Sequence, residues 1–169
     1  MSGAGSRAAG SRGTGCAGER GVDCAGLRGA EALAAAMGWL GTPYRHQGSL
    51  RGVGADCLGL VRGVYRELYG MEPEEPPPYP PDWALAPEGD PMREAAARHL
   101  RAASSIEDRQ PGDVLLFRFR PGGPAQHMGI LASRSAEAES FIHAYEQAAV
   151  VLSPLPPAWQ RRIVGVFRF

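Results

Sequence analysis

The sequence predicts an α+β domain in which N-terminal helices pack against a C-terminal antiparallel β-sheet. Two observations predict this class. Apolar residues recur at helical spacing in the first part of the chain, and from about residue 114 they form short extended runs separated by turn residues. At 169 residues and 44% hydrophobic content, the chain is long enough for one domain with a core, and too short for two comfortable ones. We therefore expect one domain.

The N-terminal segment, residues 1–29, is rich in Gly, Ser, Arg and Ala and has almost no large apolar side chains. Such a segment buries too little surface to offset the entropy of ordering it. We predict a disordered tail over 1–29 and a domain over 30–169. Cys16 and Cys24 fall in this tail, where we interpret them as incidental thiols. Three cysteines without a CxxC pair indicate neither a disulfide framework nor a four-cysteine zinc site.

Charge and hydropathy exclude several classes of function. The 18 basic and 18 acidic residues cancel, so the chain has no net field to hold a polyanion, and we expect no nucleic-acid partner. No apolar run approaches the ~20 residues that a membrane helix requires. The N-terminus lacks the apolar core of a secretion signal. We expect a chain that is synthesised in the cytoplasm, has no membrane span and does not export itself by a signal peptide.

The first helix is predicted from Ala30, where the run AEALAAAMGWL begins, and Gly41 and Pro43 end it. Three apolar residues share one face of this helix and are expected in the core: Leu33, Met37 and Leu40. After a Gly-rich loop, Asp56 is a good N-cap for a second helix that Gly70 ends. One face of the second helix carries Cys57, Val61, Val64 and Leu68.

The segment 71–91 contains most of the prolines and is predicted to be a stiff, extended surface excursion. Asp90 and Pro91 predict the N-cap and first position of a third helix that continues to about Ala103. Beyond it, turn residues separate the extended runs, as in an antiparallel meander. These runs are 114–119, 127–132, 141–146, 150–155 and 163–169.

One thiol and two imidazoles are the candidate catalytic groups. A thiol becomes a useful nucleophile when its pKa falls from about 8.5 toward neutrality, and the first turn of a helix beside an imidazole can lower it. Cys57 is expected in such a turn. His127 begins one predicted strand and His143 lies inside the next, so adjacent antiparallel strands would bring the rings together. In this interpretation His127 accepts the proton of Cys57, and His143 orients His127.

Structural interpretations of the same residues stay open. Free cysteines are often small core residues, so Cys57 could simply fill space. A structural zinc ion held by Cys57, His127 and His143 is a second possibility, but the spacing matches no common zinc pattern and only three ligands are visible. We rank catalysis above zinc, and we expect no metal and no cofactor. We interpret His46 as a solvated loop histidine, with a place at the border of the cleft as the alternative. The three tryptophans, Trp39, Trp83 and Trp159, are interpreted as packing anchors, with docking on a partner protein as the alternative for Trp83.

Five short motifs occur in a fixed order over residues 30–169. They are GTPY (41–44), ADCLGL (55–60), PGDVLLF (111–117), HMGIL (127–131) and FIHA (141–144). In this order they resemble the NlpC family (NlpC/p-sixty) of papain-like cysteine peptidases. Any one motif alone would be weak, but five in order are a specific match. The resemblance implies a papain-like NlpC fold, with the active site in the cleft between the helical part and the sheet.

Residue by residue, the resemblance implies that Cys57 is the nucleophile, His127 the general base and His143 the third, orienting residue. It also implies that Tyr44 lies near the thiol and lines the site, and we place Asp56 at the edge of the site as the N-cap. The implied reaction is hydrolysis of an amide bond in a peptidoglycan stem peptide through a thioester. At Leu58 this sequence departs from the family, since many members carry Ser directly after the cysteine. The side chain at this position is not catalytic, so the difference concerns the shape of a subsite.

The string from Gly41 to Gly70, the proline-rich segment and the terminal WQRRIVGVFRF resemble one branch of the family, the phage cell-wall peptidases, including those in the tails of gene transfer agents. This resemblance implies tail hub or tail-tip partners, incorporation into a tail particle and action in the periplasm of a recipient cell. Two alternatives stay open. One is a structural tail-tip adaptor with the same fold and little activity, and the other is a peptidoglycan amidase or acyltransferase on the same scaffold.

Overall fold

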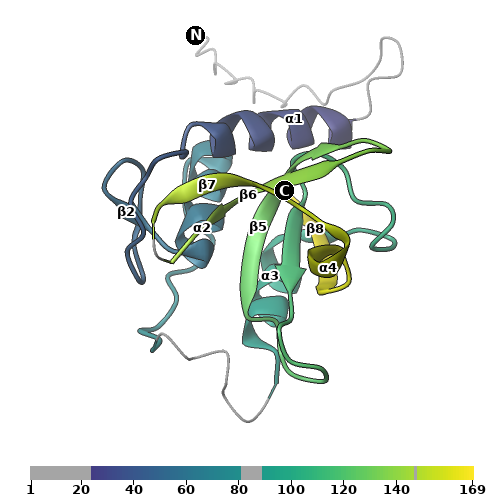
Figure 1. Ribbon diagram of the computed structural model, residues 1–169. Helices are drawn as coiled ribbons and strands as arrows, with labels where there is room; N and C mark the ends of the chain where they lie inside the picture. The colour runs from purple at the N-terminus through teal and green to yellow at the C-terminus, as the bar shows by residue number, and fades with distance from the viewer. Residues whose placement is uncertain (1–23, 81–88, 147) are drawn as a thin grey trace, which may run out of the picture.

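A computed structural model of the 169-residue chain describes residues 24–80, 89–146 and 148–169 (Figure 1). Over this part the chain forms helices α1 (Cys24–Met37), α2 (Cys57–Tyr69), α3 (Pro91–His99) and α4 (Pro157–Gln160). The strands are β1 (Ser49–Leu50), β2 (Gly54–Ala55), β3 (Arg101–Ala102), β4 (Val114–Phe117), β5 (His127–Arg134), β6 (Glu139–Ala144), β7 (Val150–Pro154) and β8 (Ile163–Arg168). The predicted α+β class is confirmed. None of the described helices is long and apolar enough to cross a membrane.

The main sheet has six strands in the order β3-β8-β4-β5-β6-β7, and every neighbouring pair is antiparallel. The meander prediction is confirmed for β4 to β7, which follow one another in the sheet as they do in the chain. It is wrong for β8, which pairs with β4 instead of extending the sheet beyond β7. The chain passes through α4 before it enters β8, so the last strand returns to the other side of the meander.

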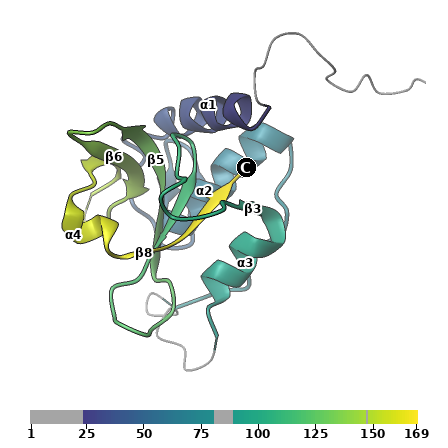
Figure 2. The same cartoon turned by 90° about the vertical axis from the view of Figure 1, so that its right-hand side faces the viewer.

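The sheet is packed on both faces. Figure 2 shows α2 and α3 on one side of the strands and α4 on the other. Alternate residues of β4 enter different cores: Val114 and Leu116 join the helices α1, α2 and α3, whereas Leu115 and Phe117 pack beside Trp159 of α4. All four of these β4 side chains are fully buried. The central strands are therefore held rigidly, and they carry the residues described below.

The first helix begins earlier than the sequence predicts. α1 starts at Cys24, so the prediction of a disordered tail is wrong for residues 24–29, while residues 1–23 lie outside the described part of the chain. Gly29 packs closely against the backbone of Pro111, since a Cβ placed on Gly29 would be 2.9 Å from the Pro111 carbonyl oxygen. Tertiary packing thus extends a helix through a glycine-rich stretch of poor helix propensity.

The predicted core face of the first helix is only partly right: Leu33 packs against the core, but the other two predicted residues do not. Met37 and Leu40 are 45% and 36% exposed, whereas Ala32, Ala36 and Trp39 are at most 1% exposed. The small alanine side chains allow α1 to lie close to α2, and the indole fills the space at its end. The prediction failed for Met37 and Leu40 because it favoured the large residues over the alanines.

α2 has the boundaries that its sequence predicts. The side chain of Asp56 accepts a hydrogen bond from Gly59 N, and Gly70 adopts the left-handed conformation with φ +78° at the C-cap. α3 begins at the predicted N-cap Asp90 but ends at His99 instead of near Ala103. It ends early because the next residues form β3, which pairs with β8.

Candidate active site

The candidate nucleophile lies in the first turn of α2. The two carboxylate oxygens of Asp56 accept hydrogen bonds from Gly59 N and Gln47 N, each at 2.7 Å. Cys57 follows this fixed N-cap directly and is partly buried. Gly59 allows the preceding loop to lie against the helix, because a Cβ there would collide with the carbonyl of Gly48. Both the cap and the glycine therefore hold the thiol in one place.

Two histidines lie on neighbouring strands. His127 is the first residue of β5 and His143 lies in β6. His127 Nε2 is 2.9 Å from His143 Nδ1, and His143 Nε2 is 3.0 Å from Ser153 Oγ in β7. The register supports this geometry, since Ser153 pairs with Phe141, two residues before His143, and so lies on the same face. A hydrogen-bonded chain thus runs across three strands.

Aromatic side chains enclose this imidazole pair. The Phe141 ring stacks on His143 with centroids 4.3 Å apart, and Trp159 of α4 lies 6.1 Å and 6.0 Å from His127 and His143. Phe117 and Phe119 contact His127. The rings shield the histidines from water, His143 more fully than the partly buried His127, so Trp159 belongs to the site as well as to the core.

The thiol and the histidines line one cavity of about 320 Å³. Tyr44 and Asp56, which the sequence analysis places at the site, also line it. Among its described lining residues, the carboxylates are Asp56 and Glu146, and there is no Lys or Arg. The structure therefore brings all five predicted site residues to a single cavity between the first turn of α2 and the sheet.

Burial is the main influence on the Cys57 thiol. It raises the pKa of Cys57 to about 12, and the charge of Asp56 acts in the same direction. The backbone N–H groups of Met128, Leu58 and Cys57 itself lower the pKa, as a helix N-terminus should, but they are outweighed. The expectation of a net lowered thiol pKa is therefore wrong. With its pKa raised in this way, the thiol keeps its proton near neutral pH.

The same desolvation keeps the histidines neutral. Burial lowers the pKa of His127 to about 3, with His143 contributing, and lowers the pKa of His143 to about 4. A neutral imidazole has one N–H and one acceptor nitrogen. When Nδ1 of His127 is the acceptor for a thiol proton, its Nε2–H donates to His143 Nδ1, and His143 Nε2–H donates to Ser153 Oγ. This assignment gives every hydrogen bond in the chain one donor and one acceptor.

Tyr44 lies beside the thiol on a fixed loop. Its backbone forms a bridge with Ala55, and its N–H donates to Ala148 at 3.1 Å. Burial raises the pKa of Tyr44 to about 12, and the charges of Asp56 and Cys57 add to this. The phenol therefore stays protonated and can donate a hydrogen bond into the cavity.

The geometry disfavours the zinc interpretation of these residues. His127 Nε2 and His143 Nδ1 face each other at hydrogen-bond distance, so these two nitrogens do not converge with Cys57 on a shared position. In the described ranges, no group of three or more His, Cys, Asp or Glu side chains is arranged to hold a metal ion.

Three further residues belong to the site and were not found from the sequence: Ser153, Trp159 and Tyr79. His46, interpreted above as a solvated loop residue, lines the cavity and lies 2.7 Å from the carbonyl oxygen of Tyr79. The alternative, a place at the border of the cleft, is therefore right for His46, because Tyr79 packs against its ring. Ser153 had a signal, since it lies in a predicted strand next to the one carrying His143. Tyr79 had none, and Trp83 lies outside the described residues.

The fold and the site define the class of protein. A thiol at a helix N-terminus, opposite an imidazole on an antiparallel sheet, is the arrangement of the papain-like α+β proteins. The chain belongs to the NlpC/P60 family, whose profile matches residues 41–168. The match covers all five sequence motifs.

Known proteins support this placement. The chain is 27% identical over 125 residues to Murein DD-endopeptidase MepS/Murein LD-carboxypeptidase of Escherichia coli K12, covering 73% of this chain and 54% of the relative. It is 30% identical over 139 residues to Murein DD-endopeptidase MepH of the same organism, covering 81% and 44%. The chain thus spans about half the length of these curated relatives.

Solved structures show the same fold. The NlpC/p60 domain of the peptidoglycan hydrolase SagA matches with a TM-score of 0.56 at 22% identity, covering 83% of this chain and 98% of that domain. NlpC2 from Trichomonas vaginalis also matches with a TM-score of 0.56, at 17% identity, covering 88% of this chain and 49% of that one. At these identities the likeness concerns the fold.

Proposed function

We propose that this protein is a peptidoglycan hydrolase that cleaves an amide bond in a stem peptide, with Cys57 as the nucleophile. The observation that carries the proposal is a single cavity lined by the Cys57 thiol and by His127, the first member of a hydrogen-bonded chain that continues through His143 to Ser153. The names of the E. coli relatives, which are murein endopeptidases, support the choice of substrate.

The geometry supports acyl transfer through a thioester. Nδ1 of His127 takes the proton of Cys57 while the sulfur attacks the amide carbonyl carbon and forms a C–S bond. Backbone N–H groups at the start of α2 lie close to the sulfur and can stabilise the oxyanion. The protonated His127 then gives its proton to the leaving nitrogen, and the C–N bond breaks. Water then attacks the thioester carbonyl carbon and forms a C–O bond while His127 takes its proton. The C–S bond breaks, and His127 gives this proton to the sulfur, which restores the thiol.

The pKa directions constrain the first step. Burial favours the neutral thiol and the neutral imidazole, so separating charge before a substrate arrives is unfavourable. Proton transfer therefore accompanies the attack of sulfur. His143 and Ser153 act in this step by holding His127 in the tautomer that can accept the proton.

The proposal is tested by digesting purified sacculi and identifying the products by mass spectrometry. Cys57→Ala should abolish cleavage, and His127→Ala should reduce it by about 10²–10⁴-fold, the usual contribution of a general base. Cys16→Ala, which changes a cysteine that the mechanism does not use, should cleave as the wild type does. A Cys57→Ala protein with wild-type turnover would refute the proposal. Cleavage at the lactoyl amide instead of within the stem peptide would identify an amidase.

We further propose that the protein acts as a component of a phage-like tail or a gene transfer agent. The support is the likeness of the string from Gly41 to Gly70 and of the terminal WQRRIVGVFRF to that branch of the family. In this proposal the chain is made in the cytoplasm, binds tail hub or tail-tip proteins and opens peptidoglycan in the periplasm of a recipient cell.

The proposed location has its own test. Particles purified from the producing cells should contain the protein at a fixed ratio to tail proteins, as measured by quantitative mass spectrometry. Particles carrying Cys57→Ala should assemble normally and lose DNA delivery. Absence of the protein from purified particles would refute the location without affecting the enzymatic proposal, whereas normal delivery by the variant particles would support a structural adaptor.

A further inference from the structure

The proline-rich segment 72–80, called the strap below, is fixed to two helices by its acidic residues. Glu72 accepts hydrogen bonds from Arg62 of α2, with Nη2 at 2.6 Å and Nε at 3.2 Å, and it also pairs with Arg66. Glu74 accepts from Arg98 of α3 at 2.7 Å. Prolines along the strap restrict its backbone to extended conformations. The strap is therefore held across α2 and α3 in a defined path.

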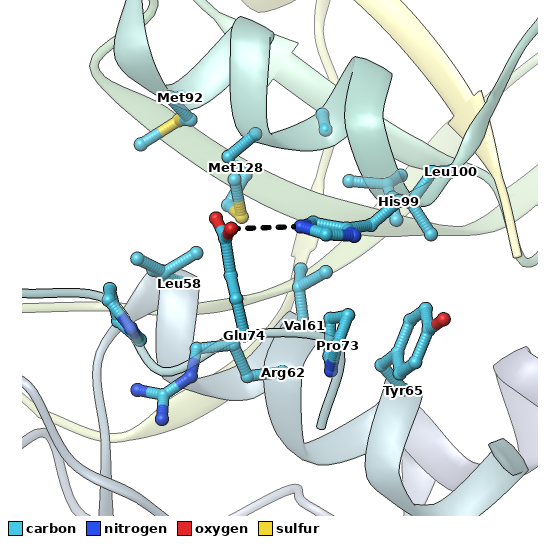
Figure 3. A pocket seen from close by; sticks show the side chains of 14 residues that line it. Leu58, Val61, Arg62, Tyr65, Pro73, Glu74, Met92, His99, Leu100 and Met128 are labelled. Carbon is cyan, nitrogen blue, oxygen red and sulfur yellow. Dashed lines mark ion pairs between the residues drawn. The ribbon is translucent and has the colours of Figure 1, made fainter. Parts of the chain in front are cut away.

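A small apolar cavity lies under the start of the strap. Its volume is about 80 Å³, and its walls include Leu58, Met92 and Met128 (Figure 3). Glu74 reaches across it toward His99, with Nε2 and Oε2 3.2 Å apart. A space of this size holds only a few water molecules, so we assign it no ligand. Its walls show instead that the strap packs against the helical core.

The other end of the strap enters the active-site cavity. The hydroxyl of Tyr79 donates to Asp56 Oδ2 at 2.6 Å, and the Tyr79 carbonyl accepts from Gln47 Nε2 and His46 Nε2, each at 2.7 Å. The Tyr79 ring contacts the His46 ring edge to face at 5.1 Å and lines the cavity that holds Cys57. Both the backbone and the side chain of Tyr79 are therefore fixed at the cavity wall.

Tyr79 completes the hydrogen bonding of a buried charge. Asp56 is 3% exposed, and its oxygens already accept from Gly59 N and Gln47 N. Its charge acts on the neighbouring thiol of Cys57, so the carboxylate is electrostatically part of the cavity. The Tyr79 hydroxyl is a further donor to Oδ2, and His46 Nδ1 lies 3.7 Å from the same oxygen. A cationic group of a substrate that enters the cavity would have to compete with this hydroxyl to pair with Asp56.

We propose that Tyr79 is a specificity-determining residue: by capping Asp56 it makes the subsite beside Cys57 accept a neutral, acylated part of the stem peptide in preference to a free amine. The proposal rests on the proposed function and names the substrate class of that site. The anchors at Glu72 and Glu74 serve to keep Tyr79 at this position.

The first test measures the charge of the subsite without any activity. Two thiol reagents, cationic 2-aminoethyl methanethiosulfonate and neutral methyl methanethiosulfonate, are compared, and the modification rate of Cys57 is followed by mass spectrometry of its peptide. Tyr79→Phe removes the capping hydroxyl and keeps the ring. It should raise the ratio of cationic to neutral rates by about fivefold, because an uncapped carboxylate attracts the cation.

The matched control is Tyr145→Phe, which removes a hydroxyl from the same cavity but not from Asp56. Its rate ratio should equal that of the wild type. A second variant, Glu74→Gln, weakens the ion pair that holds the strap on α3, and Glu74 does not line the active-site cavity. This variant should shift the rate ratio in the same direction as Tyr79→Phe does. An unchanged ratio in both Tyr79→Phe and Glu74→Gln would overturn the proposal.

The second test uses substrates. A stem peptide with a free amine and the same peptide N-acetylated are compared by kcat/KM, and the wild type should favour the acetylated form. Tyr79→Phe should shift the preference toward the amine by about fivefold. If both peptides are cleaved and Tyr79→Phe has the same preference as the wild type, the role of Tyr79 is overturned, while the proposed function stands. If the wild type cleaves neither peptide, the proposed function fails, and the reagent ratio still decides the role of Tyr79.

Discussion

The two histidines of the site are neutral because aromatic rings enclose them, and this has a consequence for the pH dependence of the reaction. Burial lowers the pKa of His127 to about 3, so a base that is ordinarily protonated below pH 6.5 stays competent at pH 5. We expect kcat/KM for a soluble muropeptide at pH 5 to lie within about twofold of its value at pH 7. Initial rates from pH 4 to 8 give this profile.

Opening the aromatic enclosure supplies the control for that profile. Trp159→Ala removes a ring that contacts both His127 and His143, and water should then reach the imidazoles. The acidic limb of kcat/KM should move up toward pH 6.5. A wild-type enzyme whose activity is already halved near pH 6.5 would contradict desolvation as the cause, because the histidines would then be solvated.

Ser153 has a positioning role that can be measured. Its Oγ is 3.0 Å from His143 Nε2, so Ser153→Ala removes the acceptor at the end of the imidazole chain. We expect kcat to fall about fivefold with KM unchanged, since the hydrogen bond orients the base and does not touch substrate. Ser153→Thr keeps a hydroxyl and should restore kcat. A loss that Thr does not rescue, or a matching change in KM, would point to a purely structural role.

Single residues differ in how far the sequence predicts them. Cys57, His127 and His143 lie in short motifs whose order along the chain is enough to indicate the site. Tyr79 could not be predicted, because its place depends on ion pairs that fix a segment without periodic pattern to two helices. The pKa of Cys57 could not be predicted either, since desolvation in the folded protein outweighs the effect of the helix turn that carries it.

At the level of elements, α2 packs through a glycine against the turn that follows α1. A Cβ on Gly63 would overlap the Trp39 ring, which is 1% exposed and cannot move into solvent without opening the core. Gly63→Ala should therefore lower the free energy of unfolding by about 1–3 kcal/mol despite the better helix propensity of Ala. Urea titration followed by circular dichroism measures this.

Gly123→Ala is a suitable comparison, because the nearest atoms to its Cβ are 3.3 Å and 3.5 Å away and its backbone is unstrained. It should change the free energy of unfolding by less than about 0.5 kcal/mol. Equal stabilities for the Gly63 and Gly123 variants would contradict the prediction for Gly63→Ala, because the Trp39 ring would then move away from α2 at little cost.

The bounds of a helix or strand can be predicted from the sequence only where residues close in the chain determine them. α2 begins and ends at its own caps, Asp56 and Gly70, and both were predicted. The start of α1, the end of α3 and the position of β8 depend on partners distant in the chain. The pairing of β3 with β8, for example, converts residues that follow α3 with helical composition into a strand.

At the scale of the whole molecule, the site lies where the helical part meets the sheet. Cys57 packs with the core formed by α1, α2 and α3, whereas the rings around the histidines belong to the core on the α4 face. Loss of either core would separate the thiol from its base. Folding and catalysis are therefore coupled, and the buried histidines affect stability as well as reaction.

This coupling predicts acid sensitivity. Below pH 6.5 the unfolded chain protonates His127 and His143, whereas the folded protein resists protonation down to pKa values of about 3 and 4. The unfolded state then binds more protons, so the free energy of unfolding falls as the pH falls, by up to about 1.4 kcal/mol per pH unit for each histidine. Because His127 is partly exposed, its contribution to this loss of stability is smaller than that of His143.

The double variant His127→Asn/His143→Gln isolates this effect. Between pH 6.5 and 4.5 the wild type should lose about 2–4 kcal/mol more stability than the variant, as measured by urea unfolding at each pH. Asp113, whose pKa burial raises, acts in the opposite direction and equally in both proteins, so it cancels in the difference. Parallel losses in the two proteins would mean that the imidazoles are protonated in the folded state. Such a result would also contradict the flat pH profile of kcat/KM, because the acid sensitivity and the flat profile both follow from the desolvation of His127 and His143.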